Sequence, residues 1–217
     1  MSAPAKAART SPAAAAPGAR RRGPATREAI LTQALHLFAR KGYEATSVRD
    51  LSQAVGVSDA ALYRHFAAKD DIAAELFQTH FGNFARSIRK IGAASANIHE
   101  LVHLLADLLC TLHDDTPDVF RFILLHQHEH LRFVHDESNA VAALVALMAT
   151  AHARGEIVIE EAELAAAIAL GSAIQPAVFQ IYGRLPGPLR TRQQTIEAAI
   201  LRSLGAAPAA DSATDST

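Results

Sequence analysis

Several features that define large classes of protein are rare or missing in the sequence. It contains one cysteine, Cys110, so an intrachain disulfide is excluded. Because Cys110 lies inside an apolar run, we interpret it as a small buried residue and not as a nucleophile. No uninterrupted apolar stretch reaches the roughly 18 residues that a transmembrane helix needs. No apolar run follows the arginines near the start, so we expect no secretory or twin-arginine signal and a cytoplasmic protein.

Net charge is also nearly absent, at −1, but the charges are distributed unevenly. The first 25 residues hold five basic side chains and no acidic one, namely Lys6, Arg9, Arg20, Arg21 and Arg22. Such asymmetry indicates an arm that meets a polyanion, where the three consecutive arginines could enter a minor groove or neutralise phosphates. A solvated, disordered tail is the alternative, and the sequence does not decide between them.

Runs of β-branched residues are scarce. EIVIE at 156–160 is the only strand-like segment, and a single strand cannot build a sheet. Apolar residues recur at helical spacing almost to the end, and no internal repeat is found. We therefore predict an all-α fold of about nine helices. The expected segments are 26–40, a short helix from Ser47, another capped by Ser58, and then 70–91, 97–113, 116–134, 137–153, 160–183 and 188–204.

Residues 47–66, SVRDLSQAVGVSDAALYRHF, have the layout of a helix-turn-helix. Ser47 and Asp50 form a capping-box pattern that begins the first short helix. Gly56 supplies the tight turn, where a Cβ would be resisted. Two short helices cannot bury their apolar faces alone, so the preceding helix is expected to cover them. A plain αα-hairpin inside a bundle has the same layout.

The wider segment 42–72, GYEATSVRDLSQAVGVSDAALYRHFAAKDDI, resembles the DNA-binding domain of TetR-type transcriptional regulators. The glycine-aromatic pair, the "VS", the "LYRHF" and the following lysine stand at the family spacing, and the resemblance covers about residues 26–72. It implies a homodimer, a palindromic operator and a small-molecule-binding core. The domains expected from it are a disordered basic arm (1–23), a DNA-binding domain (24–70), a ligand-binding and dimerisation domain (71–206) and a disordered tail (207–217).

The resemblance and the residue chemistry together give a predicted DNA-binding set: Thr46, Ser47, Arg49, Ser58, Asp59, Ala60, Ala61, Tyr63, Arg64, His65 and Lys69. Small side chains at the start of the second short helix permit close approach to base edges, and an alanine methyl can meet a thymine methyl. The two arginines are candidates for polar contacts with DNA. The residues expected to hold phosphates are Thr46, Ser47, Tyr63, His65 and Lys69. Tyr63 and His65 could instead pack on the first helix.

HELVH at 99–103 and HQHEH at 126–130 match zinc-hydrolase patterns. The extension typical of one such class fails, since Ala106 replaces its glycine and Leu109 its third histidine. Four interpretations stay open for these histidines: surface or satisfied residues, the wall of a ligand pocket, a regulatory metal site, and a catalytic zinc site. We predict no catalytic residue, no bound metal and no cofactor, and place His103, His126 and His130 in a pocket for an anionic or polar-headed molecule.

Residues 160–183 carry a wide apolar face of small side chains, which lets helices approach closely, and the helix expected at 188–204 adds larger apolar residues. In TetR-like proteins the last two helices pair with their twofold mates, and an internal core pair is the alternative. The expected function is that of a non-enzymatic, DNA-binding transcriptional repressor, a homodimer released from its operator by an unknown small molecule. A metal-responsive regulator of the same fold is the nearer alternative, and a zinc-dependent hydrolase the more distant one.

Overall fold

The computed structural model describes the backbone of residues 19–130 and 139–208, and the side chains of 23–125 and 139–208. These residues form α-helices, one 3₁₀-helix and no strand. The bounds are α1 Ala19–Lys41, α2 Val48–Val55, α3 Asp59–Tyr63, α4 Lys69–Ala94, α5 Ile98–Asp115, α6 Pro117–His130, α7 Ala140–Ala153, α8 Ala162–Ile181, η3 Leu189–Arg192 and α9 Gln193–Leu204.

The all-α prediction is confirmed, and most predicted boundaries lie within a few residues of the observed ones. One difference is at the start, where α1 begins at Ala19, inside the segment predicted to be a disordered arm. Alanine and arginine are both strong helix formers, which explains how the helix extends ahead of Pro24. The other is at 188–204, where the expected single helix begins as η3.

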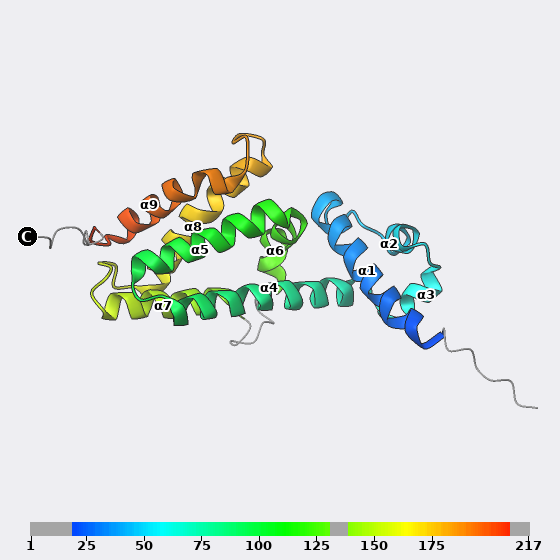
Figure 1. The fold of residues 1–217 in the computed structure, drawn as a ribbon. Helices are drawn as coiled ribbons and strands as arrows, with labels where there is room; N and C mark the ends of the chain where they lie inside the picture. The colour runs from blue at the N-terminus through cyan, green and yellow to red at the C-terminus, as the bar shows by residue number, and fades with distance from the viewer. Residues whose placement is uncertain (1–18, 131–138, 209–217) are drawn as a thin grey trace, which may run out of the picture.

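The fold has two parts, which we call the head (α1, α2 and α3) and the body (α4 to α9). Figure 1 shows the head at one end, with the long α4 running from it along the full length of the body. The head is built on a buried cluster in which Leu51 of α2 and Leu62 of α3 pack against Ile30, Ala34 and Phe38 of α1. This confirms that α1 covers the two short helices.

The body has its own apolar cluster, contributed mainly by α5, α7, α8 and α9. Small residues let the helices of the body approach closely. At Gly92 of α4, an added Cβ would lie 2.2 Å from Leu147 Cδ2 of α7. The body also enters the head, because Phe122 of α6 is fully buried in the head cluster and stacks on Phe38 with ring centroids 6.1 Å apart. The same cluster includes α4 residues from Ile72 to Ile88 and also Ala140 and Ala143 of α7, so the two cores meet along α4, α6 and α7.

The strand-like segment at 156–160 is not a strand. Ile157 is buried in the body cluster, and the Val158 amide donates to the Leu204 carbonyl at 3.1 Å. Within the described residues, one helix, α8, is long and apolar enough to cross a membrane by length and composition alone. The same composition suits a helix packed between protein surfaces, and its alanines at 165, 166, 169, 173 and 177 are buried against the body.

Candidate nucleic-acid interface and apolar cavity

The start of α2 is held by the predicted capping box. Ser47 Oγ accepts from the Asp50 amide at 3.1 Å, and the Asp50 carboxylate accepts from the Ser47 amide at 2.8 Å. Lys41 Nζ donates to the same carboxylate at 2.8 Å. These hydrogen bonds, with the one from Lys41 the largest, hold the pKa of Asp50 well below its usual range. Ser47 therefore fixes the start of α2 and remains exposed to solvent.

The turn between α2 and α3 depends on Gly56, which adopts the left-handed conformation with φ at 75°. Its amide donates back to α2, and the Val57 amide donates to the Ser52 carbonyl at 3.0 Å. A residue with a Cβ would be strained there. Ser58 then caps α3, accepting from the Ala61 amide at 3.2 Å. The predicted helix-turn-helix is confirmed in its details.

Asp59 has a role that the sequence did not reveal. Its carboxylate accepts a hydrogen bond from the hydroxyl of Ser52, and Ser52 is buried at 3% exposure. The pair joins the first turn of α3 to the middle of α2. Asp59 therefore links the two short helices, in addition to lying in the first turn of α3 where it was expected.

Thr46 and Lys69 brace the loop between α1 and α2. The Thr46 side chain is 1% exposed, and its hydroxyl donates to the Gly42 carbonyl at 2.7 Å, so it offers no free surface to a phosphate. Lys69 Nζ donates to the carbonyls of Tyr43 at 2.9 Å and Thr46 at 3.0 Å, and lies 4.0 Å from the centre of the Tyr43 ring. Both residues therefore hold the loop that leads into α2.

The other predicted residues remain accessible. Ser47, Arg49, Ser58, Ala60 and Arg64 are exposed, Tyr63 is 52% exposed, and Ala61 and His65 are half-buried. Within the described residues, Arg49 and Arg64 form no ion pair. Unpaired guanidinium groups on and beside a short, exposed helix are suited to phosphates and to base edges.

An apolar cavity of about 100 Å³ lies in the body between α4, α5, α6, α7 and α8, with one contact from α9. Every side chain that lines it is aliphatic, aromatic or Met, including Phe81, Phe84, Leu109, Phe120, Leu144, Met148 and Ile174. No charged group faces it among the described residues. The cavity therefore suits the apolar part of a ligand.

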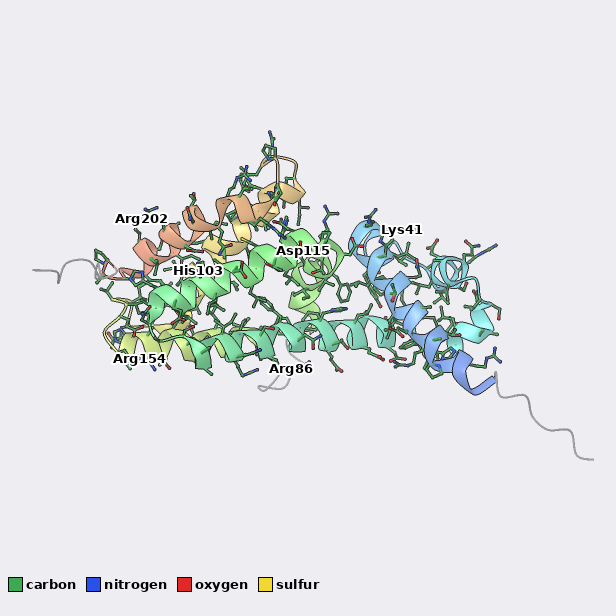
Figure 2. The ribbon with its side chains drawn as sticks, viewed as in Figure 1. Lys41, Arg86, His103, Asp115, Arg154 and Arg202 are labelled. Atoms are coloured by element: carbon green, nitrogen blue, oxygen red, sulfur yellow. The ribbon has the colours of Figure 1, made fainter. Side chains whose placement is uncertain are left out.

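Of the three histidines predicted to line a pocket, His103 does not line this cavity. His103 lies on α5 (Figure 2), its side chain is 61% exposed, and its Nδ1 is 3.0 Å from Glu197 Oε1. The reason is its helical position, since the face of α5 that turns inward carries Val102, Leu105 and Leu109. His126 and His130 lie on the α6 backbone, but their side chains fall outside the described residues.

HELVH does not assemble as zinc ligands. His99 Nε2 donates to the Ala207 carbonyl at 2.8 Å, while His103 pairs with Glu197. Glu100 turns back and accepts from the Ala96 amide at 2.8 Å, at the start of α5. In the parts of the chain that the structure describes, no three His, Cys, Asp or Glu side chains converge as metal ligands would. The three polar residues of the motif are therefore engaged with three separate partners.

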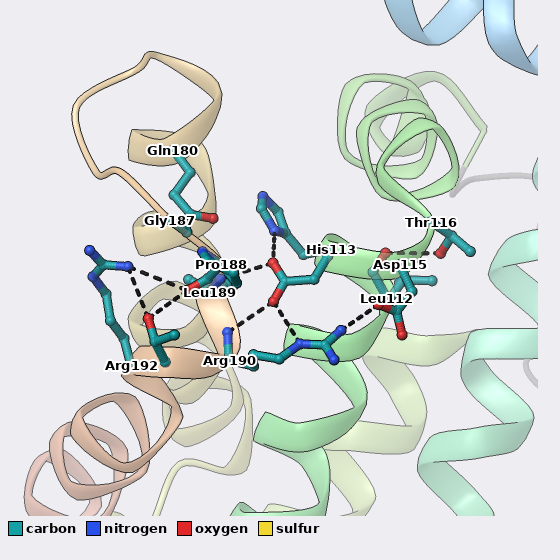
Figure 3. Close-up of polar contacts among 12 residues, drawn as sticks. Leu112, His113, Asp115, Thr116, Gln180, Gly187, Pro188, Leu189, Arg190 and Arg192 are labelled. Atoms are coloured by element: carbon teal, nitrogen blue, oxygen red, sulfur yellow. Dashed lines mark hydrogen bonds and ion pairs between the residues drawn. The ribbon is translucent and has the colours of Figure 1, made fainter.

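An ordered polar network joins the end of α5 to η3 (Figure 3). Asp114, 9% exposed, accepts from the amides of Leu189 at 2.9 Å and Arg190 at 3.0 Å, from Arg190 Nε at 3.1 Å and from His113 Nδ1 at 2.9 Å. Burial raises the pKa of Asp114, but these hydrogen bonds outweigh it and lower the value to about 2. Nothing in the local sequence distinguishes Asp114 from its neighbour Asp115.

Comparison with known proteins agrees with this geometry. Residues 30–76 match the family described as "Bacterial regulatory proteins, tetR family". The chain is 42% identical over 48 residues to the regulator TcmR of Streptomyces glaucescens, covering 22% of this chain and 21% of TcmR. It is 34% identical over 68 residues to the repressor KstR2 of Mycobacterium tuberculosis, covering 31% and 34% of the two chains. These alignments thus span about a fifth to a third of the relatives' own length.

Similarity to solved structures extends over most of the chain. The fatty acid degradation regulator FadR from Bacillus halodurans matches with a TM-score of 0.70 at 19% identity, covering 81% of this chain and 94% of that one. The regulator FadR from Bacillus subtilis, solved in complex with stearoyl-CoA, matches with a TM-score of 0.65 at 17% identity, covering 80% and 97%. At such low identity, the likeness shows a shared fold for head and body together.

Proposed function

We propose that this chain, which belongs to the TetR family of bacterial regulatory proteins, is a transcriptional repressor in the cytoplasm that binds a palindromic operator as a homodimer and is released by an apolar or amphipathic small molecule. The observation that carries the proposal is the combination of a helix-turn-helix bearing unpaired arginines with an apolar cavity elsewhere in the same chain. One part can hold DNA, and the other can sense a ligand.

On DNA, the start of α3 enters the major groove. Ala60 and Ala61 have small side chains there, which permit close approach and contact with thymine methyl groups. Arg49 and Arg64 supply polar contacts to phosphates or base edges, and Ser47, Ser58, Tyr63 and His65 hold the phosphates on either side. Asp59, Thr46 and Lys69 act indirectly, since each is engaged in bracing the helix-turn-helix.

The homodimer forms through residues 160–204. Exposed residues recur along α8 at helical spacing. Apart from Glu163 and Gln175 they are small or apolar, namely Leu164, Ala167, Gly171 and Phe179, and Tyr182 follows directly after the helix. Gly171 has no atom within 4 Å of the position that a Cβ would occupy, so a partner helix could approach it closely. An apolar stripe of this length beside a buried face favours burial against a second copy.

Phe179→Glu is therefore expected to convert the dimer to a monomer at micromolar concentration, because it places a charge in the apolar contact. The measurement is sedimentation velocity, with thermal unfolding to check the fold. Val158→Glu is the matched control, since Val158 is more exposed, at 73%, but lies outside α8. A Phe179→Glu protein that sediments as the wild type does would contradict this interface.

The effector is proposed to carry a long apolar segment. The support is the wholly apolar cavity, together with the structural neighbour whose complex holds stearoyl-CoA. A ligand of this class releases DNA only if it binds more tightly to the arrangement of heads that does not fit the operator. Fatty acids and their thioesters are therefore the first compounds to test.

The test of the function is selection of bound duplexes from a random pool with the full-length protein. We expect an inverted repeat whose half-sites have centres about one helical turn apart, or a multiple of it, because two identical heads must bind together. Specific binding should exceed binding to random duplex by about 10³-fold or more at moderate salt. Failure to enrich any symmetric sequence would exclude the proposed operator.

A further inference from the structure

Polar side chains join the head to the body at two places along α1. Towards the end of the helix, Asp118 of α6 lies between two basic residues, with His36 Nδ1 2.8 Å from its Oδ2 and Arg40 Nε 3.5 Å from its Oδ1. Towards the start, Arg27 pairs with Glu75 of α4. Within the described residues, this is the only ion pair that joins the first half of α1 to the body.

Arg27 contacts two further elements of the fold besides its own helix. Its Nη1 and Nη2 groups donate to the two carboxylate oxygens of Glu75, in the second turn of α4. Its guanidinium carbon also lies 4.6 Å from the centre of the Phe66 ring. Phe66 stands just after α3, is 4% exposed, and donates from its amide to the Leu62 carbonyl at 3.1 Å. Arg27 therefore links α1, the turn after α3 and the start of α4.

The contact between Arg27 and Glu75 is directional, whereas the packing around it is not. Ile30 of α1 and Leu76 of α4 belong to the same apolar cluster, but apolar burial has no preferred direction. Two parallel hydrogen bonds between a guanidinium and a carboxylate fix an angle as well as a distance, and an aromatic ring holds the guanidinium plane. Because the two side chains are 42% and 32% exposed, the pair should influence orientation more than overall stability.

The position of Arg27 along α1 determines which movement it can prevent. Nine residues, from 27 to 36, separate it from the contacts with Asp118, which is about 13 Å along a helix axis. With the start of α1 released, the helix could turn about its attached end. The recognition helix α3 would turn with it, because Leu62 is buried against α1.

We propose that Arg27, through Glu75 and Phe66, fixes the orientation of the head on the body and thereby decides which spacing of half-sites two heads can bind at once. The second part rests on the proposed function, since it needs a homodimer on a palindromic operator. One added base pair moves a half-site by roughly 3.4 Å and turns it by about 35° around the duplex, and two rigidly held heads cannot follow both changes. Arg27 and Glu75 are thus positioning residues that read no base.

The first experiment measures the affinity of the full-length protein for the selected operator and for duplexes whose spacer is one base pair shorter or longer. The wild type should prefer the selected spacer. Arg27→Lys keeps the charge but cannot form two parallel hydrogen bonds, so the ratio of affinities for selected and altered spacers should fall at least about threefold. Glu75→Gln should reproduce this fall from the side of α4. Thermal unfolding checks that each variant is folded.

Lys41→Ala is the matched control. Lys41 and Asp50 form an ion pair of nearly the same exposure, at 45% and 33%, but both residues belong to the head. Its loss should leave the spacer preference unchanged. Glu75→Gln also distinguishes positioning from direct contact with DNA. If Arg27 contacted a phosphate instead, its release from Glu75 would strengthen binding to every spacer equally, and that pattern would overturn the proposal.

The second experiment needs no DNA. Spin labels on Gln53→Cys of α2 and Lys90→Cys of α4, both exposed positions, report the distance between head and body within one chain. The labelled protein is diluted with unlabelled protein, and the native thiol of Cys110 is 1% exposed, which protects it from labelling. Pulsed electron paramagnetic resonance should give a broader distribution of distances in Arg27→Lys and Glu75→Gln than in the wild type and Lys41→Ala.

The two experiments separate this inference from the proposed function. Distributions of equal width in all four proteins would overturn the role of Arg27, whatever the DNA measurements show. Broader distributions with an unchanged spacer preference would keep the attachment of the head but reject its control of operator spacing. If the wild type selects no symmetric sequence, the proposed function fails, and the distance distributions still decide whether Arg27 orients the head.

Discussion

Replacing Tyr63 and Arg64 together with alanine is expected to weaken operator binding by at least about 100-fold. Each side chain is exposed, and no ion pair within the described residues engages Arg64. A single arginine contact to DNA is worth about 1–3 kcal/mol, and a homodimer loses every contact twice. About 2.7 kcal/mol in total already corresponds to 100-fold.

The same substitutions should leave the fold intact, because they remove exposed surface and no buried contact. The measurement is the operator dissociation constant at several salt concentrations. If Arg64 contacts a phosphate, the slope of log affinity against log salt should become shallower by roughly two, one for each protomer. If the affinity instead falls only for operators with a particular base at one position, and the salt slope changes little, Arg64 contacts that base.

Arg202→Ala is the control for this pair. Arg202 is also exposed, but it lies near the end of α9, at the opposite end of the molecule from the head (Figure 2). We expect its loss to change operator affinity less than threefold. Equal effects of Arg202→Ala and the double substitution would show that only net charge matters, and the proposed site on α3 would be lost.

Replacing Asp114 with alanine is expected to lower the free energy of unfolding by about 2–3 kcal/mol. The substitution leaves two amides at the start of η3 and the guanidinium of Arg190 without their acceptor, in a place where the carboxylate is only 9% exposed. Loss of a helix cap costs about 1 kcal/mol, and loss of a charge-assisted hydrogen bond adds about 1.5 kcal/mol. Denaturant unfolding of the wild type and of the Asp114→Ala variant measures the difference.

Asp115→Ala is the comparison, because its carboxylate pairs with the same Arg190 but is largely exposed. Exposed ion pairs contribute between zero and about 1 kcal/mol, so this variant should unfold nearly as the wild type does. If both substitutions cost the same, the hydrogen bonds to the η3 amides contribute nothing, and the proposed stabilisation by the link between the end of α5 and η3 is refuted.

Asp114 should also leave a signature in the pH dependence of stability. Its pKa of about 2 in the folded chain lies below the value near 3.9 of an unfolded aspartate. The unfolded state therefore binds the proton more readily, so the stabilisation is fully present above about pH 4 and is lost as pH falls toward 2. In Asp114→Ala this contribution should disappear, so the free energies of unfolding of wild type and variant should converge between pH 4 and 2.

The helix-turn-helix could be predicted residue by residue, since its determinants are local. Ser47 and Asp50 are three positions apart, Gly56 stands where the chain turns, and Ser58 caps the helix it precedes. Capping and turn formation depend on backbone groups within one helical turn, so the pattern of residues is sufficient. The family resemblance depends on the same local segment.

The apolar cavity could not be predicted from the sequence, for the opposite reason. His103 belongs to a conspicuous motif, yet it lies on the outer side of α5, and the cavity is lined by ordinary apolar residues that give no signal in the sequence. Thr46 was expected to meet phosphate, but its side chain is buried by the loop that it braces. Asp59 and Lys69 likewise acquired bracing partners that the motif does not reveal.

The sequence by itself determined the helical fold, most of the helix ends and the helix-turn-helix, because each depends on residues within a few positions of one another. Only the tertiary structure decided that Asp114 is buried while Asp115 is exposed, and that Asp118 meets His36 across 82 positions of sequence. Burial and long-range pairing depend on which helices pack together. That packing results from many small apolar contacts, and no single residue records it.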